Sequence, residues 1–250
     1  MSAHIFSSGS KREASHEVHR HRRLRGHVAH CRARDKRLCF LAPRLRAGSG
    51  HRLCLVEDYE AGALSFKDVT SFNLDEYRGL DPQHDQSYRY FMEHNLFSHV
   101  DIDPARTHVP DGACPDAAAA CAAYEQSIAE AGGLGLQLLG LGHNGHIGFN
   151  EPAPEFPKET HCVELTESTI NANSRLFDSV DDVPREAYTM GIGTIMAAKE
   201  ILVVANGSDK ADIVRRAFFG PVTPEVPASI LQFHPNVTVV VDKEAGALCQ

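Results

Sequence analysis

The 250-residue sequence has no run of 18 or more apolar residues, and its N-terminus has no apolar stretch of the length that a signal peptide requires. These absences disfavour a transmembrane helix and Sec export, so we expect a cytoplasmic protein with no membrane partner. The seven cysteines are odd in number, scattered and never arranged as C-x-x-C, which argues against a disulfide framework and a zinc knuckle. The 42% hydrophobic content is sufficient for the core of a globular protein.

The two parts of the chain differ sharply in charge. Residues 1–52 carry 13 Lys and Arg against 3 Asp and Glu, a net charge of +10, whereas residues 53–250 carry 12 against 30, a net charge of −18. An acidic body does not suit a nucleic-acid partner, although a few local donors can still hold a small anionic substrate.

Residues 1–52 are rich in Arg and His and show no sustained helical or strand period, so we expect no native folding unit there. Three interpretations stay open: a basic disordered arm, a targeting peptide, and non-native coding sequence such as a frameshift. The third accounts for the abrupt change near Leu53, where ordinary globular composition begins. We expect residues 53–250 to form a single domain.

Apolar and β-branched runs alternate with helical patterns from residue 53 onward. Strands are predicted at 69–74, 134–142, 161–165, 200–207 and 237–242, and helices at 53–64, 87–100, 115–133, 168–177 and 208–220, the last capped by Ser208. This alternation predicts an α/β fold, a Rossmann-like three-layer sandwich with a mostly parallel sheet. Ligands of such folds bind outside the carboxyl ends of the strands.

Two polar segments follow predicted strands. Asp75 and Glu76 come directly after the first strand, and because adjacent residues of an extended chain point to opposite sides, only one of them can face a crevice. Such a carboxylate is suited to act as a general base, although many carboxylates at strand ends only cap helices or meet solvent.

The loop GLGHNGHIGFNEP (140–152) supplies two histidines, two asparagines and a glutamate among four glycines, which allow close approach of the backbone to a ligand. His146 can take and return a proton near neutral pH, and Glu151 is an acidic partner that would orient it. A metal site built from His143, His146 and Glu151 is an alternative, but this spacing in a glycine-rich turn does not place two imidazoles on one helix face. A purely structural histidine is the other alternative.

Two cations follow later. Lys210 stands where a predicted strand gives way to a helix, and exposed N–H groups there attract phosphate. Arg175 has the planar guanidinium that binds phosphate through two hydrogen bonds. Each is an ordinary surface cation when considered alone, but together they indicate a phosphorylated substrate.

The segments FNLDEY, GHNGHIGFNEP, NANSRLF and GIGTIMAAKEILVVANGSDKA resemble, in order and spacing, the glucosamine-6-phosphate deaminase (isomerase) family, from about Val56 to about Asp242. The resemblance implies an enzyme of amino-sugar catabolism without metal or cofactor. It would convert glucosamine 6-phosphate to fructose 6-phosphate and ammonia, and a homo-oligomer is compatible with the resemblance.

The resemblance also implies residue roles. His146 would open the pyranose ring, oriented by Glu151 and assisted by Asn144, where some family members have Asp. Asp75 would take the C2 proton, and Arg175 and Lys210 would bind the phosphate.

One region departs from the family pattern. Family members begin with a strand that runs into a G-x-x-T-G-S-T-P turn, whereas residues 40–54 here read FLAPRLRAGSGHRLC. We therefore expect the N-terminal strand and its phosphate-binding turn to be missing or garbled. Two alternatives to an active deaminase stay open: a related sugar-phosphate enzyme such as a 6-phosphogluconolactonase or ribose-5-phosphate isomerase, and a non-catalytic copy or sugar-phosphate-binding regulator.

Overall fold

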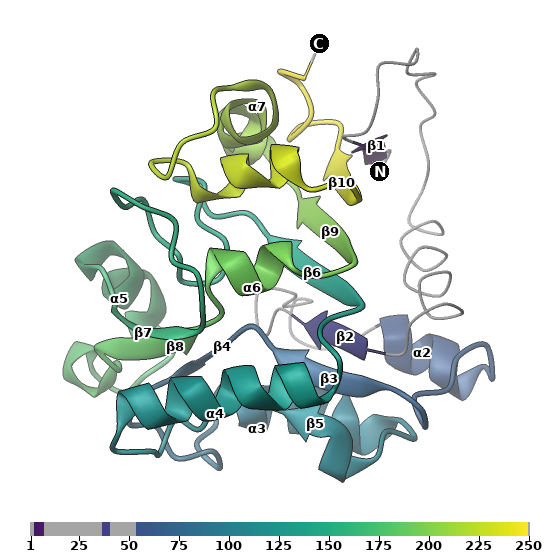
Figure 1. Ribbon diagram of the computed structural model, residues 1–250, viewed down its shortest axis with the longest axis vertical. Coiled ribbons are helices and arrows are strands. Elements are labelled where there is room, and N and C mark those ends of the chain that lie inside the picture. The colour runs from purple at the N-terminus through teal and green to yellow at the C-terminus, as the bar shows by residue number, and fades with distance from the viewer. Residues whose placement is uncertain (1–2, 8–36, 41–53, 250) are drawn as a thin grey trace.

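A computed structural model describes residues 3–7, 37–40 and 54–249 of the chain. Its main feature is a seven-stranded sheet of order β1-β10-β9-β6-β2-β3-β5, in which every neighbouring pair is parallel except β1 and β10 (Figure 1). The strands are β1 Ala3–Ser7, β2 Arg37–Phe40, β3 Thr70–Asn73, β5 Thr107–His108, β6 Leu136–Gly140, β9 Glu200–Ala205 and β10 Val237–Asp242. The predicted α/β class and mostly parallel sheet are confirmed.

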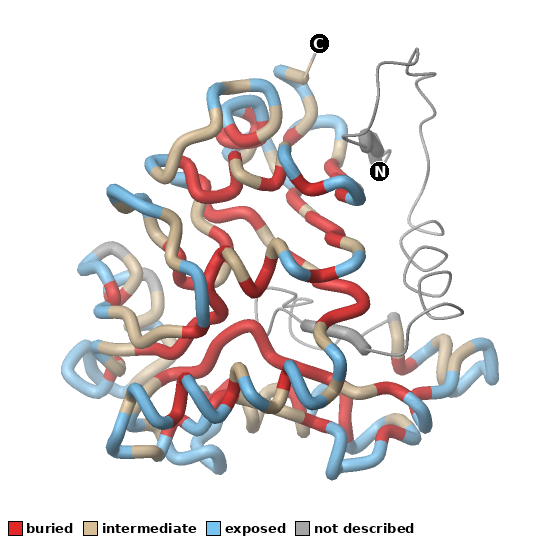
Figure 2. The backbone as a smooth tube through the Cα atoms, viewed as in Figure 1, coloured by how far each residue is buried: buried red, intermediate tan, exposed pale blue. Residues whose placement is uncertain are grey.

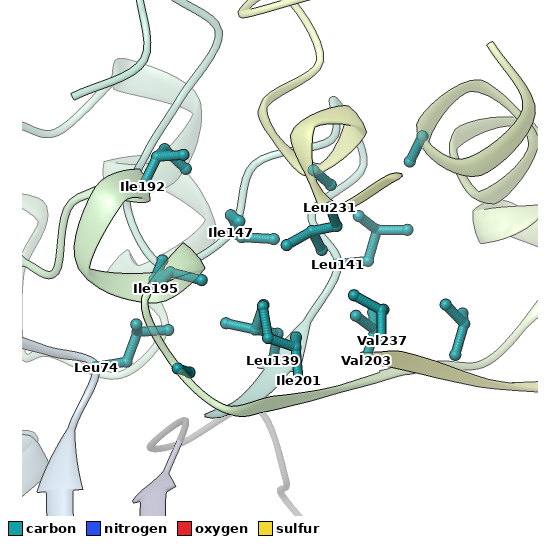
Figure 3. Close-up of a cluster of buried hydrophobic side chains, with 14 of the residues drawn as sticks. Leu74, Leu139, Leu141, Ile147, Ile192, Ile195, Ile201, Val203, Leu231 and Val237 are labelled. Carbon is teal, nitrogen blue, oxygen red and sulfur yellow. The ribbon is translucent and has the colours of Figure 1, made fainter. Parts of the chain in front are cut away.

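Helices pack on both faces of this sheet because its central strands are apolar on both sides. On β9, Ile201 and Val203 belong to one buried cluster, and Leu202 between them belongs to another. The first cluster, part of which is shown in Figure 3, also receives residues of α4 Ala117–Glu130, α6 Ile192–Met196, α7 Ala211–Phe219 and the 3₁₀ helix η5 Pro227–Phe233. The second receives residues of α2 Cys54–Glu60 and α3 Tyr88–Asn95.

Helix ends follow their capping residues. Ser87 and Asp116 each cap a helix as the sequence suggests, through side-chain oxygens that accept from Tyr90 N and Ala119 N. Ser208 does not cap the predicted helix 208–220, which corrects that prediction. It opens a short 3₁₀ helix, η4 Ser208–Lys210, and α7 begins only at Ala211.

A second sheet of three short antiparallel strands lies beside the first, in the order β4-β8-β7. Its strands are β4 Asp75–Tyr77, β7 His161–Glu164 and β8 Glu186–Thr189, and helix α5 Glu167–Ser174 lies between β7 and β8 in sequence. Only one of these strands, at 161–165, was predicted. Asp75 therefore does not simply end the first strand, because the chain leaves β3 at Asn73 and enters the second sheet.

The strand β2, Arg37–Phe40, pairs in parallel with both β3 and β6. The position between β3 and β6 is therefore filled, which corrects the expectation that a central N-terminal strand is missing. The alternative, that the sequence there is garbled, stays a prediction. The expected loss of the phosphate-binding turn, and most of the basic segment 1–52, lie outside the described residues. Within the described part of the chain, no helix is long and apolar enough to cross a membrane.

Three strand ends converge at one edge of the large sheet. β3 leads into Asp75, β6 leads into the glycine-rich loop (residues 140–152), and β9 leads into η4. The strand order reverses between β6 and β2, which is where an open parallel sheet leaves a crevice. Figure 2 shows the backbones of β3, β6 and β9 largely buried and the outer turns of α4 exposed.

Candidate active site

A cavity of about 490 Å³ lies at this edge of the sheet. Asp75, His146, Arg175 and Lys210 all line it, although they come from four separate segments of the chain. Asn144 and Glu151 stand behind His146 and contact it directly. The structure thus brings all six predicted site residues to one place.

The two carboxylates of β4 have different surroundings. Asp75 is 3% exposed and lines the cavity. The equally buried Glu76 accepts hydrogen bonds from Ser87 Oγ and from the backbone N–H groups of Tyr77, Tyr88 and Arg89. Burial raises the pKa of the Glu76 carboxyl despite these four donors. Glu76 therefore holds the start of α3, and only Asp75 faces the cavity.

Glycine makes the loop conformation possible. Gly145 and Gly148 have φ of 91° and 62°, a region that side chains with a Cβ rarely adopt. A Cβ on Gly142 would lie 2.3 Å from Cε1 of His146. The imidazole of His146 therefore lies directly against the bare backbone of Gly142.

Three side chains of the loop form a hydrogen-bonded chain. Asn144 Nδ2 donates to Glu151 Oε2 at 2.5 Å, and Asn144 Oδ1 accepts from both the backbone N–H and Nδ1 of His146, at 3.1 and 2.7 Å. Glu151 Oε1 lies 3.3 Å from the same Nδ1 and 3.4 Å from Thr169 Oγ1. Because Asn144 Oδ1 can only accept, the proton of the neutral imidazole is on Nδ1.

The protonation state of Glu151 follows from these contacts. Burial alone raises the pKa of its carboxyl, but the hydrogen bond and charge of His146, with hydrogen bonds from Asn144 and Thr169, outweigh burial and leave the pKa below its ordinary value. Glu151 is therefore an anion at neutral pH. Nε2 of His146 is buried with no hydrogen-bond partner among the described residues, so it is available to a ligand in the cavity.

The cations lie at another part of the wall. Arg175 is the C-cap residue of α5 and is exposed, while Lys210 ends η4 and is half-buried. Asn173 of α5 donates to Tyr77 Oη of β4 at 3.0 Å, and both residues line the cavity. This hydrogen bond joins the helix that carries Arg175 to the strand that carries Asp75.

Several contacts could not be predicted from sequence. His143 Nε2 lies 2.6 Å from Asp209 Oδ2, a partner 66 residues away. Thr189 stands opposite Asp75 in the β4–β8 ladder, and its Oγ1 accepts from the backbone N–H of Phe149 at 3.1 Å. The metal alternative required His143 beside His146 and Glu151, but no group of three or more His, Cys, Asp or Glu in the described segments is placed to hold a metal ion.

Fold and site together define an α/β protein with an acid–base pocket at the carboxyl edge of its sheet. The glucosamine-6-phosphate isomerases/6-phosphogluconolactonase family matches residues 51–240. The chain belongs to this family.

Two curated relatives support this family assignment. The chain is 56% identical over 186 residues to the glucosamine-6-phosphate deaminase of Lachnoclostridium phytofermentans, which covers 74% of this chain and 79% of that protein. It is 53% identical over 194 residues to the deaminase of Halothermothrix orenii, with 78% and 80% covered.

Solved structures show the same fold. A monomeric glucosamine-6-phosphate deaminase is 40% identical, with a TM-score of 0.83 over 89% of this chain and 92% of that one. The 6-phosphogluconolactonase of Thermotoga maritima shares only 18% identity, with a TM-score of 0.65 over 87% and 90%, and shows the fold alone.

Proposed function

We propose that this protein is a glucosamine-6-phosphate deaminase, which converts glucosamine 6-phosphate and water to fructose 6-phosphate and ammonia. The observation that carries the proposal is that Asp75 and His146 line one cavity together with two cations. The sequence similarity to deaminases supports it, and we infer a Rossmann-like three-layer sandwich for the whole domain.

Ring opening is assigned to His146. Nε2 is the unpartnered base of the pocket, so it accepts the proton of the C1 hydroxyl as the C1–O5 bond breaks. The imidazolium then returns a proton to O5. The Glu151 carboxylate lies beside the imidazole of His146 while the imidazole carries the proton, and Asn144 fixes the orientation of the imidazole through Nδ1.

Isomerisation is assigned to Asp75. Once the sugar is an open-chain aldehyde, its C2 proton is acidic enough for a positioned carboxylate to remove. Asp75 takes that proton while O1 takes one from the C2 ammonium group of the substrate, which gives a neutral enolamine. Asp75 then delivers its proton to C1 and leaves an iminium at C2, so the hydrogen moves from C2 to C1. Water then adds to the resulting C2 iminium carbon and ammonia leaves, which yields the ketone.

The 6-phosphate is assigned to Arg175 and Lys210. Both line the same cavity as the acid–base groups, and a guanidinium and an ammonium are the usual partners of a phosphate dianion. Their charge attracts the substrate although the body of the chain is acidic.

The test is ammonia release from glucosamine 6-phosphate by the purified full-length protein. We expect turnover by the wild type, and a fall in kcat of about 10²–10⁴-fold for Asp75→Asn with sugar-phosphate binding retained. Unchanged turnover in Asp75→Asn would refute the assignment of the base.

A matched control is Asp85→Asn. Asp85 is a second carboxylate on the cavity wall, but its side chain is 69% exposed and lies 3.3 Å from His84. We expect this variant to keep the kcat of the wild type. If the purified wild type releases no ammonia, the proposed function itself is wrong.

A further inference from the structure

The pair formed by His143 and Asp209 connects two parts of the cavity that are remote in sequence. His143 belongs to the glycine-rich loop, and Asp209 belongs to η4. The bond between Nε2 and Oδ2 is 2.6 Å long, and the two side chains are 71% and 60% exposed. An isolated surface pair of this kind contributes little to the stability of the fold. Its interest lies in the residues that it joins.

Each partner adjoins a residue of the proposed site. His143 precedes Asn144, the residue that orients His146, and it lines the cavity itself. Asp209 precedes Lys210 and does not line the cavity. The bond therefore runs from the acid–base loop to the turn that presents a phosphate-binding cation.

Asp209 places a negative charge next to Lys210, the cation that is assigned to the phosphate dianion. The hydrogen bond from His143 lowers the pKa of the Asp209 carboxyl, and the charges of His143 and Lys210 lower it further. Electrostatic interaction is mutual, so the carboxylate that responds to Lys210 also weakens the attraction of Lys210 for phosphate. A donor on Oδ2 offsets part of that negative charge.

We propose that His143 is a positioning residue for phosphate binding, which acts by occupying Asp209 and so protecting the Lys210 subsite from an uncompensated carboxylate. The proposal rests on the proposed function, because it takes a sugar phosphate as the substrate.

Four variants test the proposal by steady-state ammonia release: His143→Ala, His143→Gln, Asp209→Asn and the double variant His143→Ala/Asp209→Asn. We expect His143→Ala to raise KM about 3–10-fold with a smaller change in kcat, since an unpartnered carboxylate repels the phosphate. His143→Gln keeps an N–H donor and should recover part of the loss. The double variant should return KM to the value of Asp209→Asn.

If the contact only stabilised the fold, Asp209→Asn would not lower the raised KM of His143→Ala. Rescue in the double variant therefore distinguishes the proposed role from a purely structural one. If the effects of His143→Ala and Asp209→Asn on KM simply multiply in the double variant, the proposal is overturned. The rise in KM should also shrink from low to high ionic strength, because the groups are exposed and salt screens them. A rise that is the same at both salt concentrations likewise contradicts it.

Asp212→Asn is the matched control. It removes the same charge three residues along the chain, from a side chain that pairs with Arg216 at 3.9 Å and lies outside the cavity. We expect no rescue of His143→Ala by this substitution. Rescue by Asp212→Asn would show that the rise in KM depends only on the net charge of the protein, and it would overturn the specific role of His143.

Failure of the proposed function is separable from failure of this proposal. Glucose 6-phosphate carries the same phosphate but no amino group, so the shift in Tm that it causes reports binding without deamination. A wild type that releases no ammonia but shows the same pattern of rescue in Tm shifts refutes the deaminase and keeps the role of His143. A wild type that releases ammonia, with no rescue in the double variant, supports the deaminase and overturns the role of His143.

Discussion

Asp75 and Glu76 are adjacent residues of β4, yet the first lines the cavity and the second binds the hydroxyl of Ser87 and two backbone N–H groups at the start of α3, as well as the N–H of Tyr77. The strand thus fixes the candidate base through its neighbour, because rotation of β4 would break the contacts of Glu76.

We expect Glu76→Ala to destabilise the fold by about 3 kcal/mol or more, since three buried donors and one partly buried donor lose their acceptor. Glu76→Gln keeps the shape and one acceptor oxygen, so its loss should be smaller. Urea unfolding of both variants measures the difference. Equal losses would show that side-chain volume, not hydrogen bonding, is what matters at this position.

The pH dependence of this stabilisation has a definite sign. Burial raises the pKa of the Glu76 carboxyl, so the folded state holds this proton more tightly than the unfolded chain. The stabilisation is complete below the ordinary value of 4.5 and is lost as pH rises through the raised value. The stability of the wild type minus that of Glu76→Gln should therefore fall with rising pH.

Glu151 should show the opposite sign. Its pKa is below the ordinary 4.5, because contacts with His146, Asn144 and Thr169 outweigh the effect of burial, so its stabilisation is present above 4.5 and is lost as pH falls through the lowered value. In unfolding titrations, the advantage of the wild type over Glu151→Gln should shrink in acid. An advantage that grows in acid would mean that the carboxyl is protonated in the folded protein.

Gly142→Ala should impair turnover more than folding. The new Cβ would meet the imidazole of His146 at 2.3 Å, and the ring has to move away from its position beside Asn144. A displacement of about 1 Å costs about 10²-fold in kcat. Ammonia release measures kcat, and the Tm measures folding.

Gly133→Ala is the control for this variant. Gly133 has φ of 80°, but its added Cβ would meet nothing within 4 Å. It should lower stability by about 1 kcal/mol through backbone strain and leave kcat unchanged. A fall in kcat for Gly133→Ala equal to that of Gly142→Ala would show that the loss comes from general destabilisation.

Arg175→Lys should raise KM about 10-fold, because the ammonium keeps the charge but loses the two parallel hydrogen bonds of the guanidinium. Arg175→Gln should raise it further, with a smaller effect on kcat. The control is Arg185→Gln, since Arg185 is half exposed and pairs with Glu167 and Asp181 outside the cavity. If KM does not change in Arg175→Gln, the phosphate assignment is wrong.

The sequence predicts those features that depend on nearby residues. The β-branched run 237–242 and the mixed apolar run 200–205 form strands, and Ser87 and Asp116 begin helices where their oxygens meet the first free N–H groups. The loop after β6 could be identified from the sequence because a merely structural loop has little use for two histidines, two asparagines and a glutamate among four glycines.

Features that depend on tertiary contacts were missed. The segments at 75–77 and 186–189 are too short and polar to show a strand period, and they become strands through the pairing of β8 with both β4 and β7. Glu76 accepts hydrogen bonds from backbone N–H groups at the start of α3, which lies elsewhere in the sequence, whereas the Ser208 side chain caps no helix. Which N–H groups a side chain can reach is decided only in the folded structure. The pair His143–Asp209 has no local signal.

Thr189 occupies the boundary between the two sheets, opposite Asp75 on one side and bound to the backbone of Phe149 on the other. The completely buried Thr189 side chain therefore ties the strand that carries Asp75 to the loop that carries His146. We expect substitutions at this interior position to change the spacing between the two proposed catalytic groups without replacing either of them.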